Sequence, residues 1–201
     1  DLHPVAHSSL HDALPIWSPQ ENERVDVNSL LEDLTKIMAE PLSKNAGVTL
    51  HTHLEPDLPP VIASRNALKQ VFINLIRNAV EAMKGGGDLA LQTRRREAGA
   101  ANGSGALAET PSDLVEIEVS DSGNGVPESL RSRLFEPFVS TKQDGHSGLG
   151  LSIVHSLVDS CGGEIACEGK PEGGTTFRVA FPAAKTNAEL EDVPGEETPS
   201  G

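Results

Sequence analysis

The segment Asn74-Leu75-Ile76-Arg77-Asn78-Ala79-Val80-Glu81-Ala82 decides how this chain is expected to fold. It lies in a stretch that begins at Ser64, ends near Met83 and has apolar residues at helical spacing. Asn74 and Asn78 are four residues apart, so they share one face of that helix. An apolar stripe flanks this face, made of Leu68, Val71, Phe72, Leu75, Ile76 and Ala79. Two amides at the edge of a buried surface each need a partner, which is either a ligand or, in a purely structural interpretation, solvent or the other amide.

On the N-terminal side of this segment, the pattern predicts a helix followed by a strand. Asn28 or Ser29 can cap the helix, and Ser29 with Glu32 fits a capping box. Gly47 is expected to end the helix, because glycine adopts the left-handed conformation of a helix terminus without strain. Alternating apolar residues then predict a strand over Val48–His53.

On the C-terminal side, strands alternate with glycine-rich connections. The expected strands are residues 88–93, 114–120, 164–168 and 175–181. The expected helices are residues 128–134 and 150–160. Glycine, serine and polar residues predict loops over residues 97–113 and 137–148.

A carboxylate stands at the end of the second of these strands, in Asp121-Ser122-Gly123-Asn124-Gly125. The two glycines place this acceptor beside a backbone that a ligand can approach closely. The structural alternative is a simple Asp-Gly turn. The segment Gly173-Gly174-Thr175-Thr176-Phe177 opens the last strand, where Thr175 could form a hydrogen bond near Asp121. Its alternative is a hairpin turn.

Glycines also precede the helix expected over residues 150–160. A helix N-terminus with free N–H groups is a natural phosphate site, and Lys142 could add a mobile positive charge. The alternative is an ordinary glycine-rich loop. The spacing matches neither the P-loop pattern nor the dinucleotide fingerprint.

Composition excludes several classes of function. The net charge of -14 argues against binding nucleic acid through a basic surface. Cys161 and Cys167 are too few for a disulfide scaffold and match no zinc spacing, which favours reduced thiols and a cytoplasmic setting. No run approaches the roughly 20 apolar residues of a membrane span, so we expect no membrane segment in this chain.

The chain is expected to contain one domain, over residues 25–183, between two tails. Residues 1–24 have no periodicity and are interpreted as a disordered or non-native leader. Within them, the segment Ser8 to Trp17 resembles the translation of a sequencing-adapter oligonucleotide; the alternative is a frayed native linker. Residues 184–201 are acidic and contain two prolines, which predicts a disordered tail.

Five pieces of this sequence resemble the N, G1, F, G2 and G3 boxes of histidine kinases, in the family's order. They are Asn78 in its helix, Asp121-x-Gly123-x-Gly125, Phe135-Glu136-Pro137-Phe138, Gly148-Leu149-Gly150 and Gly174-Thr175-Thr176-Phe177. Histidine kinases share an ATPase superfamily with gyrase, Hsp90 and MutL, and these boxes look most like the nitrogen-regulatory and PAS-linked kinases. The resemblance implies a Bergerat-type α/β fold, a two-layer sandwich in which a mixed sheet of about five strands carries three main helices on one face.

The resemblance also implies roles for single residues. Asn78 would coordinate Mg²⁺, which keeps most of its ligands as water and phosphate oxygens. Asp121 would accept a hydrogen bond from the adenine amino group, while Gly123 and Gly125 let the backbone pack against the base. Thr175 would support the adenine pocket.

The remaining implied roles concern the phosphates and the ATP lid, expected over residues 139–147. Gly148 and Gly150 would set a helix N-terminus at the phosphates, and Lys142 would reach the γ-phosphate. Phe135 and Phe138 would anchor the start of the lid or serve as plain core aromatics. The implied catalytic residues are Asn78 and Lys142, and the implied nucleotide-binding set is Asn74, Asn78, Asp121, Gly123, Gly125, Val126, Phe138, Lys142, Gly148, Leu149, Gly150, Leu151 and Thr175.

One departure from the wider superfamily bears on the chemistry. Gyrase-like and Hsp90-like ATPases carry a water-activating glutamate four residues before the magnesium asparagine, and Asn74 occupies that position here. An amide cannot take a proton from water as a carboxylate can, so the site is expected to hold ATP for another nucleophile.

The histidine that receives the phosphoryl group is not identifiable. His3, His7 and His11 lack the family's phosphoacceptor context. The expected function is therefore the catalytic domain of a sensor histidine kinase, inactive alone, with ATP and Mg²⁺ as cofactors. Its expected partners are its own dimerisation domain, in a homodimeric full-length kinase, and a response regulator. The alternatives are a nucleotide-binding module or a serine-directed kinase of the anti-sigma type.

Overall fold

The structure is a computed structural model that describes residues 22–97, 113–139 and 149–184. The helices of this part are α1 (Val27–Ala46), α2 (Arg65–Ala82), α3 (Glu128–Arg131) and α4 (Gly150–Ser160). The strands are β1 (Glu23–Val25), β2 (Val48–Leu54), β3 (Val61–Ala63), β4 (Gly87–Arg96), β5 (Leu114–Asp121), β6 (Glu164–Gly169) and β7 (Thr175–Pro182).

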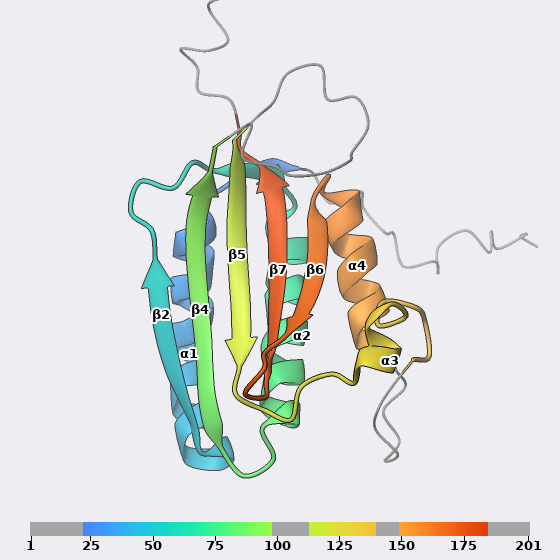
Figure 1. Cartoon of the computed structure of the whole chain (residues 1–201). Coiled ribbons are helices and arrows are strands. Elements are labelled where there is room, and N and C mark those ends of the chain that lie inside the picture. Colours follow the sequence, from blue (N-terminus) through green and yellow to red (C-terminus); the bar gives the residue numbers. More distant parts are fainter. Residues whose placement is uncertain (1–21, 98–112, 140–148, 185–201) are drawn as a thin grey trace, which may run out of the picture.

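The described residues form a five-stranded sheet in the order β2-β4-β5-β7-β6. The pair β2–β4 is parallel, whereas the other neighbours are antiparallel. A parallel pair needs a crossover connection, and α2 supplies it between β2 and β4. The helices α1, α2 and α4 lie together behind the sheet (Figure 1). The expected mixed two-layer sandwich is confirmed.

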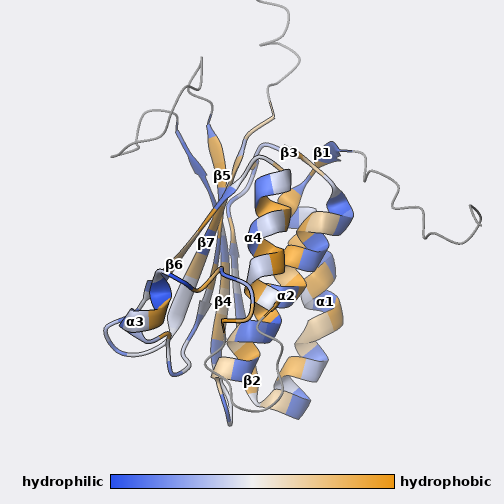
Figure 2. Ribbon diagram, turned by 90° about the vertical axis from the view of Figure 1, so that its right-hand side faces the viewer, coloured by the Kyte–Doolittle hydropathy of each residue, from blue (hydrophilic) through white to orange (hydrophobic). Residues whose placement is uncertain are grey.

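The core lies between the sheet and these three helices, whose inward surfaces are largely apolar (Figure 2). The central helix α2 contributes the stripe expected from the sequence, and each of its members is at most 1% exposed: Leu68, Val71, Phe72, Leu75, Ile76 and Ala79. Opposite it, β4 and β5 contribute Leu89, Leu91, Val115, Ile117 and Val119. Because the apolar face of α2 is buried along its length, the helix is a rigid platform for the polar residues at its C-terminal end.

The expected N-terminal cap of α1 is wrong. Asp26, one residue beyond β1, has an extended backbone, and its carboxylate accepts a 3.0 Å hydrogen bond from the Ser29 amide. Asn28 instead faces the sheet, where its side chain donates to the Glu55 carbonyl at 2.7 Å and accepts from the Thr93 hydroxyl at 2.8 Å. At the other end, Gly47 caps α1 as expected, with a φ of 64°.

The sequence did not predict β1 and β3, which form a separate antiparallel pair. Each strand has three residues, which is too short for a periodic pattern to stand out from a loop. Their pairing brings Val25 and Val61 together, and both side chains are buried. This pair joins the segment before α1 to the segment before α2.

The opposite face of the sheet carries a chain of ion pairs. Arg94 and Arg96 on β4 both donate hydrogen bonds to the carboxylate of Glu116 on β5. Arg178 on β7 then joins Glu118 to Glu168, so alternating charges run across four strands. Glu116 is only 2% exposed, and the two arginines satisfy its carboxylate in that setting. None of the helices in the described part of the chain has the length and apolar character needed to cross a membrane.

Candidate nucleotide-binding site

The polar face of α2 carries the two asparagines singled out by the sequence. Asn74 is 4% exposed and lies among the core residues of the helix. Asn78, one turn further on, is half-buried, and its side-chain nitrogen is fully buried with no hydrogen-bond partner among the described residues. A buried donor without a partner costs free energy, so its presence marks a place where a ligand is expected to bind.

The N-terminus of α4 lies beside Asn78. A Cβ atom at Gly150, the first residue of α4, would lie 3.8 Å from Asn78 Oδ1 and 3.9 Å from Asn78 Nδ2. The preceding Leu149 makes no side-chain capping bond, and the first turn of α4 contains no acidic residue. The free N–H groups and the positive end of the helix dipole therefore remain available to an anion.

Asp121 ends β5 in a buried position, 2% exposed. Its Oδ1 accepts hydrogen bonds from the amides of Gly123 at 2.8 Å and Thr175 at 3.3 Å. Lys170, in the turn between β6 and β7, donates to the Asp121 backbone carbonyl at 2.9 Å. The loop after β5 and the turn between β6 and β7 thus meet at Asp121, whose carboxylate keeps its other oxygen for a further donor.

Close backbone approaches make glycine necessary around Asp121. A Cβ atom at Gly123 would lie 2.7 Å from the carbonyl of Ala82 at the end of α2. Gly174, with a φ of 92°, would bring a Cβ to 2.2 Å from the Asp121 carbonyl oxygen. Gly125 has a φ of 73°, and a Cβ atom there would lie 3.1 Å from the Gly174 carbonyl oxygen. The loop after β5 therefore requires glycine at positions 123 and 125, where it passes between α2 and the β6–β7 turn.

Burial is the main influence on the Asp121 carboxyl and raises its pKa above the ordinary value of 3.8. The Gly123 and Thr175 amides and the charge of Lys170 oppose this rise. Burial likewise raises the pKa of the nearby Cys167 thiol to about 11, so this thiol is neutral at physiological pH. Both Cys161 and Cys167 are free thiols, as the sequence indicated.

Lys170 is a residue of the site that the sequence did not reveal. It follows β6 in a turn whose glycines were noticed, but no spacing along the chain connects it to Asp121, 49 residues away. The turn closes on itself through the Lys170 amide, which donates to the Gly174 carbonyl at 3.1 Å. Only the β5–β7 pairing, in which Ser120 faces Thr176, brings this turn beside Asp121.

The two phenylalanines of the F-box segment have different surroundings. Phe135 is half-buried against the core, with its ring 5.4 Å from that of His155 on α4. Phe138 is 78% exposed and has a φ of 65°, so the alternative that it is a core aromatic is wrong. Val126 and Leu151 pack partly buried against the core. Lys142 and Gly148, and nearly all of the expected lid, lie outside the described residues.

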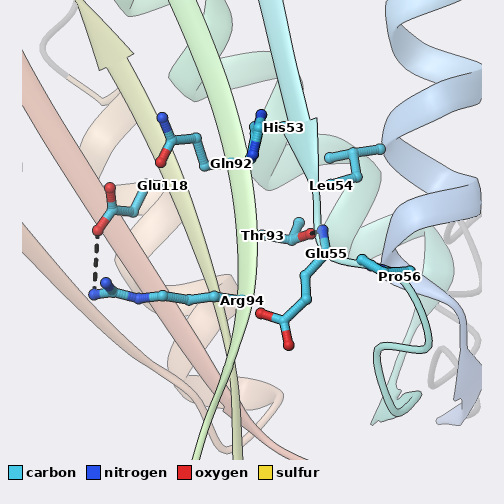
Figure 3. Close-up of a pocket in the computed structure, with 8 residues that line it drawn as sticks. All are labelled: His53, Leu54, Glu55, Pro56, Gln92, Thr93, Arg94 and Glu118. Carbon is cyan, nitrogen blue, oxygen red and sulfur yellow. Dashed lines mark hydrogen bonds and ion pairs between the residues drawn. The ribbon is translucent and has the colours of Figure 1, made fainter.

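A hollow of about 340 Å³ lies at the edge of the sheet formed by β2 and β4 (Figure 3). It is lined by His53, Leu54, Glu55, Pro56, Gln92, Thr93, Arg94 and Glu118. Several of its polar groups bond within the protein: Arg94 pairs with Glu118 at 3.4 Å, and the Glu55 amide donates to Thr93 at 3.0 Å. It shares no residue with the site around Asn78 and Asp121.

Comparison with known proteins identifies the family. Residues 63–185 match the family described as histidine kinase-, DNA gyrase B- and HSP90-like ATPase. The chain is 36% identical over 191 residues to the sensory histidine kinase/phosphatase NtrB of Rhizobium meliloti (strain 1021), covering 92% of this chain and 49% of that protein. The chain therefore belongs to this ATPase family, as its histidine kinase catalytic domain type, and the expected likeness to nitrogen-regulatory kinases is confirmed.

Solved structures agree with this assignment. The catalytic domain of the histidine kinase ThkA superposes with a TM-score of 0.65 at 27% identity, covering 81% of this chain and 96% of that one. The structure of ThkA in complex with the response regulator protein TrrA gives a TM-score of 0.62 at 25% identity, with coverage of 81% and 42%. This chain spans about half the length of the curated NtrB relatives that it matches.

Proposed function

We propose that this chain binds Mg-ATP between α2 and α4 and supplies the γ-phosphoryl group to a histidine on the dimerisation domain of its own kinase. The observation that carries the proposal is the buried, unpartnered amide nitrogen of Asn78 beside the N-terminus of α4. A phosphate chain with its metal supplies what both features lack, an acceptor for the amide and an anion for the helix.

Asn78 would hold the magnesium ion. Its amide presents an oxygen ligand and a nitrogen donor at one point, which suits a group where a hard cation meets phosphate oxygens. When bound, Mg²⁺ supplies charge neutralisation at the phosphates. Asn74 stands one turn before Asn78, and as a neutral amide it does not serve as a base toward water.

Asp121 would recognise the adenine. Its Oδ1 accepts from the amides of Gly123 and Thr175. The other carboxylate oxygen keeps its lone pairs for the exocyclic amino group of the base. Burial makes a hydrogen bond to this carboxylate selective, since a base with an acceptor at that position would leave a buried acceptor unpaired. Phe138, Lys142 and Gly148 remain proposed contacts of the lid and the phosphates.

The proposal places the acceptor histidine outside this chain, so the isolated chain should not phosphorylate itself. We further propose that the full-length kinase is a homodimer in the cytoplasm and that it passes the phosphoryl group to a response regulator. The complex of ThkA with TrrA supports this kind of partner.

Calorimetric titration of the chain with Mg-ATP tests the site. Asn78→Ala and Asn78→Asp should abolish magnesium-dependent ATP binding. Asn66→Ala is the matched control, because Asn66 lies exposed on the same helix, and it should bind like the wild type. Unchanged affinity in both Asn78 variants would eliminate the metal assignment.

Labelling with γ-phosphate-labelled ATP tests the transfer. Full-length kinase should acquire an acid-labile, base-stable label, as phosphohistidine does, whereas this chain alone should acquire none. Such a label on the isolated chain would refute the proposal that the acceptor histidine lies outside it. An acid-stable label on the protein that receives the phosphoryl group would indicate a serine-directed kinase instead.

A further inference from the structure

Arg77 precedes Asn78 on α2, and neither the family boxes nor the set above gives it a role. A Cβ atom at Gly150 would lie 3.5 Å from Arg77 Nη2 and 3.8 Å from Asn78 Oδ1. The guanidinium and the amide therefore flank the same point, which is the start of α4. A cation is otherwise misplaced there, because the N-terminal end of a helix carries partial positive charge.

Among the described residues, the ion pair that Arg77 makes is weak. Its Nε lies 3.8 Å from Glu81 Oε1, one turn along α2, which is too long for a hydrogen bond. The Arg77 side chain is 58% exposed, so solvent screens this pair and the side chain is free to turn. The guanidinium thus keeps its donors for another acceptor beside Asn78 and the first turn of α4.

We propose that Arg77 is a phosphate-binding residue of the nucleotide site. Its planar fork of donors would bind oxygens of the phosphate chain from the α2 side, opposite the N–H groups of α4. An anion there would offset the repulsion between the guanidinium and the helix end and would accept from the Asn78 nitrogen. The inference rests on the proposed function, because it requires nucleotide phosphates to lie beside Asn78.

The position of Arg77 on the buried helix gives it a role distinct from that of the lid. Leu75 and Ile76 precede it on α2 and are at most 1% exposed, so its backbone is fixed relative to Asn78. The charge of Lys142, in contrast, was expected on a loop. Arg77 should therefore contribute to the binding of ADP as well as ATP, and should contribute nothing to the binding of adenosine.

The test is calorimetric titration of the Arg77→Met variant with ATP, ADP and adenosine. Loss of charge-assisted hydrogen bonds should weaken ATP and ADP binding about 10-fold or more, with adenosine binding unchanged. Arg77→Lys should recover part of the loss, since it keeps the charge without the fork. Arg65→Met is the matched control: Arg65 starts the same helix, pairs with Asp33 at 3.1 Å, and should leave all three affinities unchanged.

A Glu81→Gln substitution supplies a second readout. If Glu81 competes with phosphate for Arg77, the substitution should strengthen ATP binding in the wild type and have no effect in the Arg77→Met background. The inference would be overturned if Arg77→Met lost as much affinity for adenosine as for ATP, or lost no affinity for ATP, while the wild type binds ATP. If the wild type itself bound no ATP, the proposed function would fail first.

Discussion

Gly174 offers a sharp test of how the β6–β7 turn supports the nucleotide site. Its φ of 92° is strained for any residue with a Cβ, and a Cβ there would lie 2.2 Å from the Asp121 carbonyl oxygen. Gly85 has a similar φ of 100° but no atom within 4 Å of a Cβ position. The pair Gly174→Ala and Gly85→Ala therefore separates backbone strain from steric conflict with Asp121.

The expected losses of unfolding free energy follow from backbone strain and from the steric conflict with Asp121. Left-handed strain should cost each variant roughly 1–2 kcal/mol of unfolding free energy. Gly174→Ala must also push the turn away from β5, and overpacking of this kind typically adds about 1–3 kcal/mol. Only Gly174→Ala displaces the strand end that carries the Asp121 carboxylate, so only this variant should bind ATP more weakly.

Urea unfolding followed by circular dichroism measures the stabilities, because the chain has no tyrosine and its one tryptophan lies outside the described residues. Calorimetry measures the affinity for ATP. Equal losses of stability in both variants, together with unchanged ATP affinity in Gly174→Ala, would refute the reasoning that this turn positions Asp121.

Three further substitutions test other parts of the structure. In Asp121→Asn, the wild-type-minus-variant difference in unfolding free energy should fall as the pH rises from 3.8 through the raised pKa of Asp121, because the folded wild type holds that proton more tightly than the unfolded chain; a difference independent of pH would contradict this. Asn28→Ala removes two hydrogen bonds that join α1 to the sheet and should cost about 1–3 kcal/mol in urea unfolding; a loss within error would contradict that role. Phe135→Ala should lower the melting temperature, whereas Phe138→Ala, at a 78% exposed position, should leave it unchanged; the reverse order would contradict the burial described.

The long elements of this fold were predictable because their patterns are local. The apolar stripe of α2 recurs with the helical period, and Gly47 marks the end of α1 with a conformation that few other residues adopt. The limits of α4 were predicted residue for residue, since glycines flank its apolar pattern on both sides. Short or context-dependent features, such as the β1–β3 pair and the cap at Asp26, were not predicted from the sequence.

The cap at Asp26 illustrates why a local signal can mislead. Asn28, Ser29 and Asp26 are all good capping residues, and the sequence cannot rank them. The choice depends on where β1 releases the chain and on the polar partners that the sheet offers to Asn28. One partner, Glu55, directly follows β2 and the other, Thr93, lies in β4, and they reach Asn28 only after the sheet has formed.

The sequence by itself determined the class of this domain and the identity of its glycine-rich and asparagine pieces, because each piece is a short run whose residue types limit the backbone or carry the chemistry. The tertiary structure alone decided which side chains meet. Lys170 bonds to Asp121, and Arg77 flanks the start of α4, because strand pairing and helix packing bring distant segments together. Such contacts depend on three-dimensional position, which the spacing of residues along a chain does not encode.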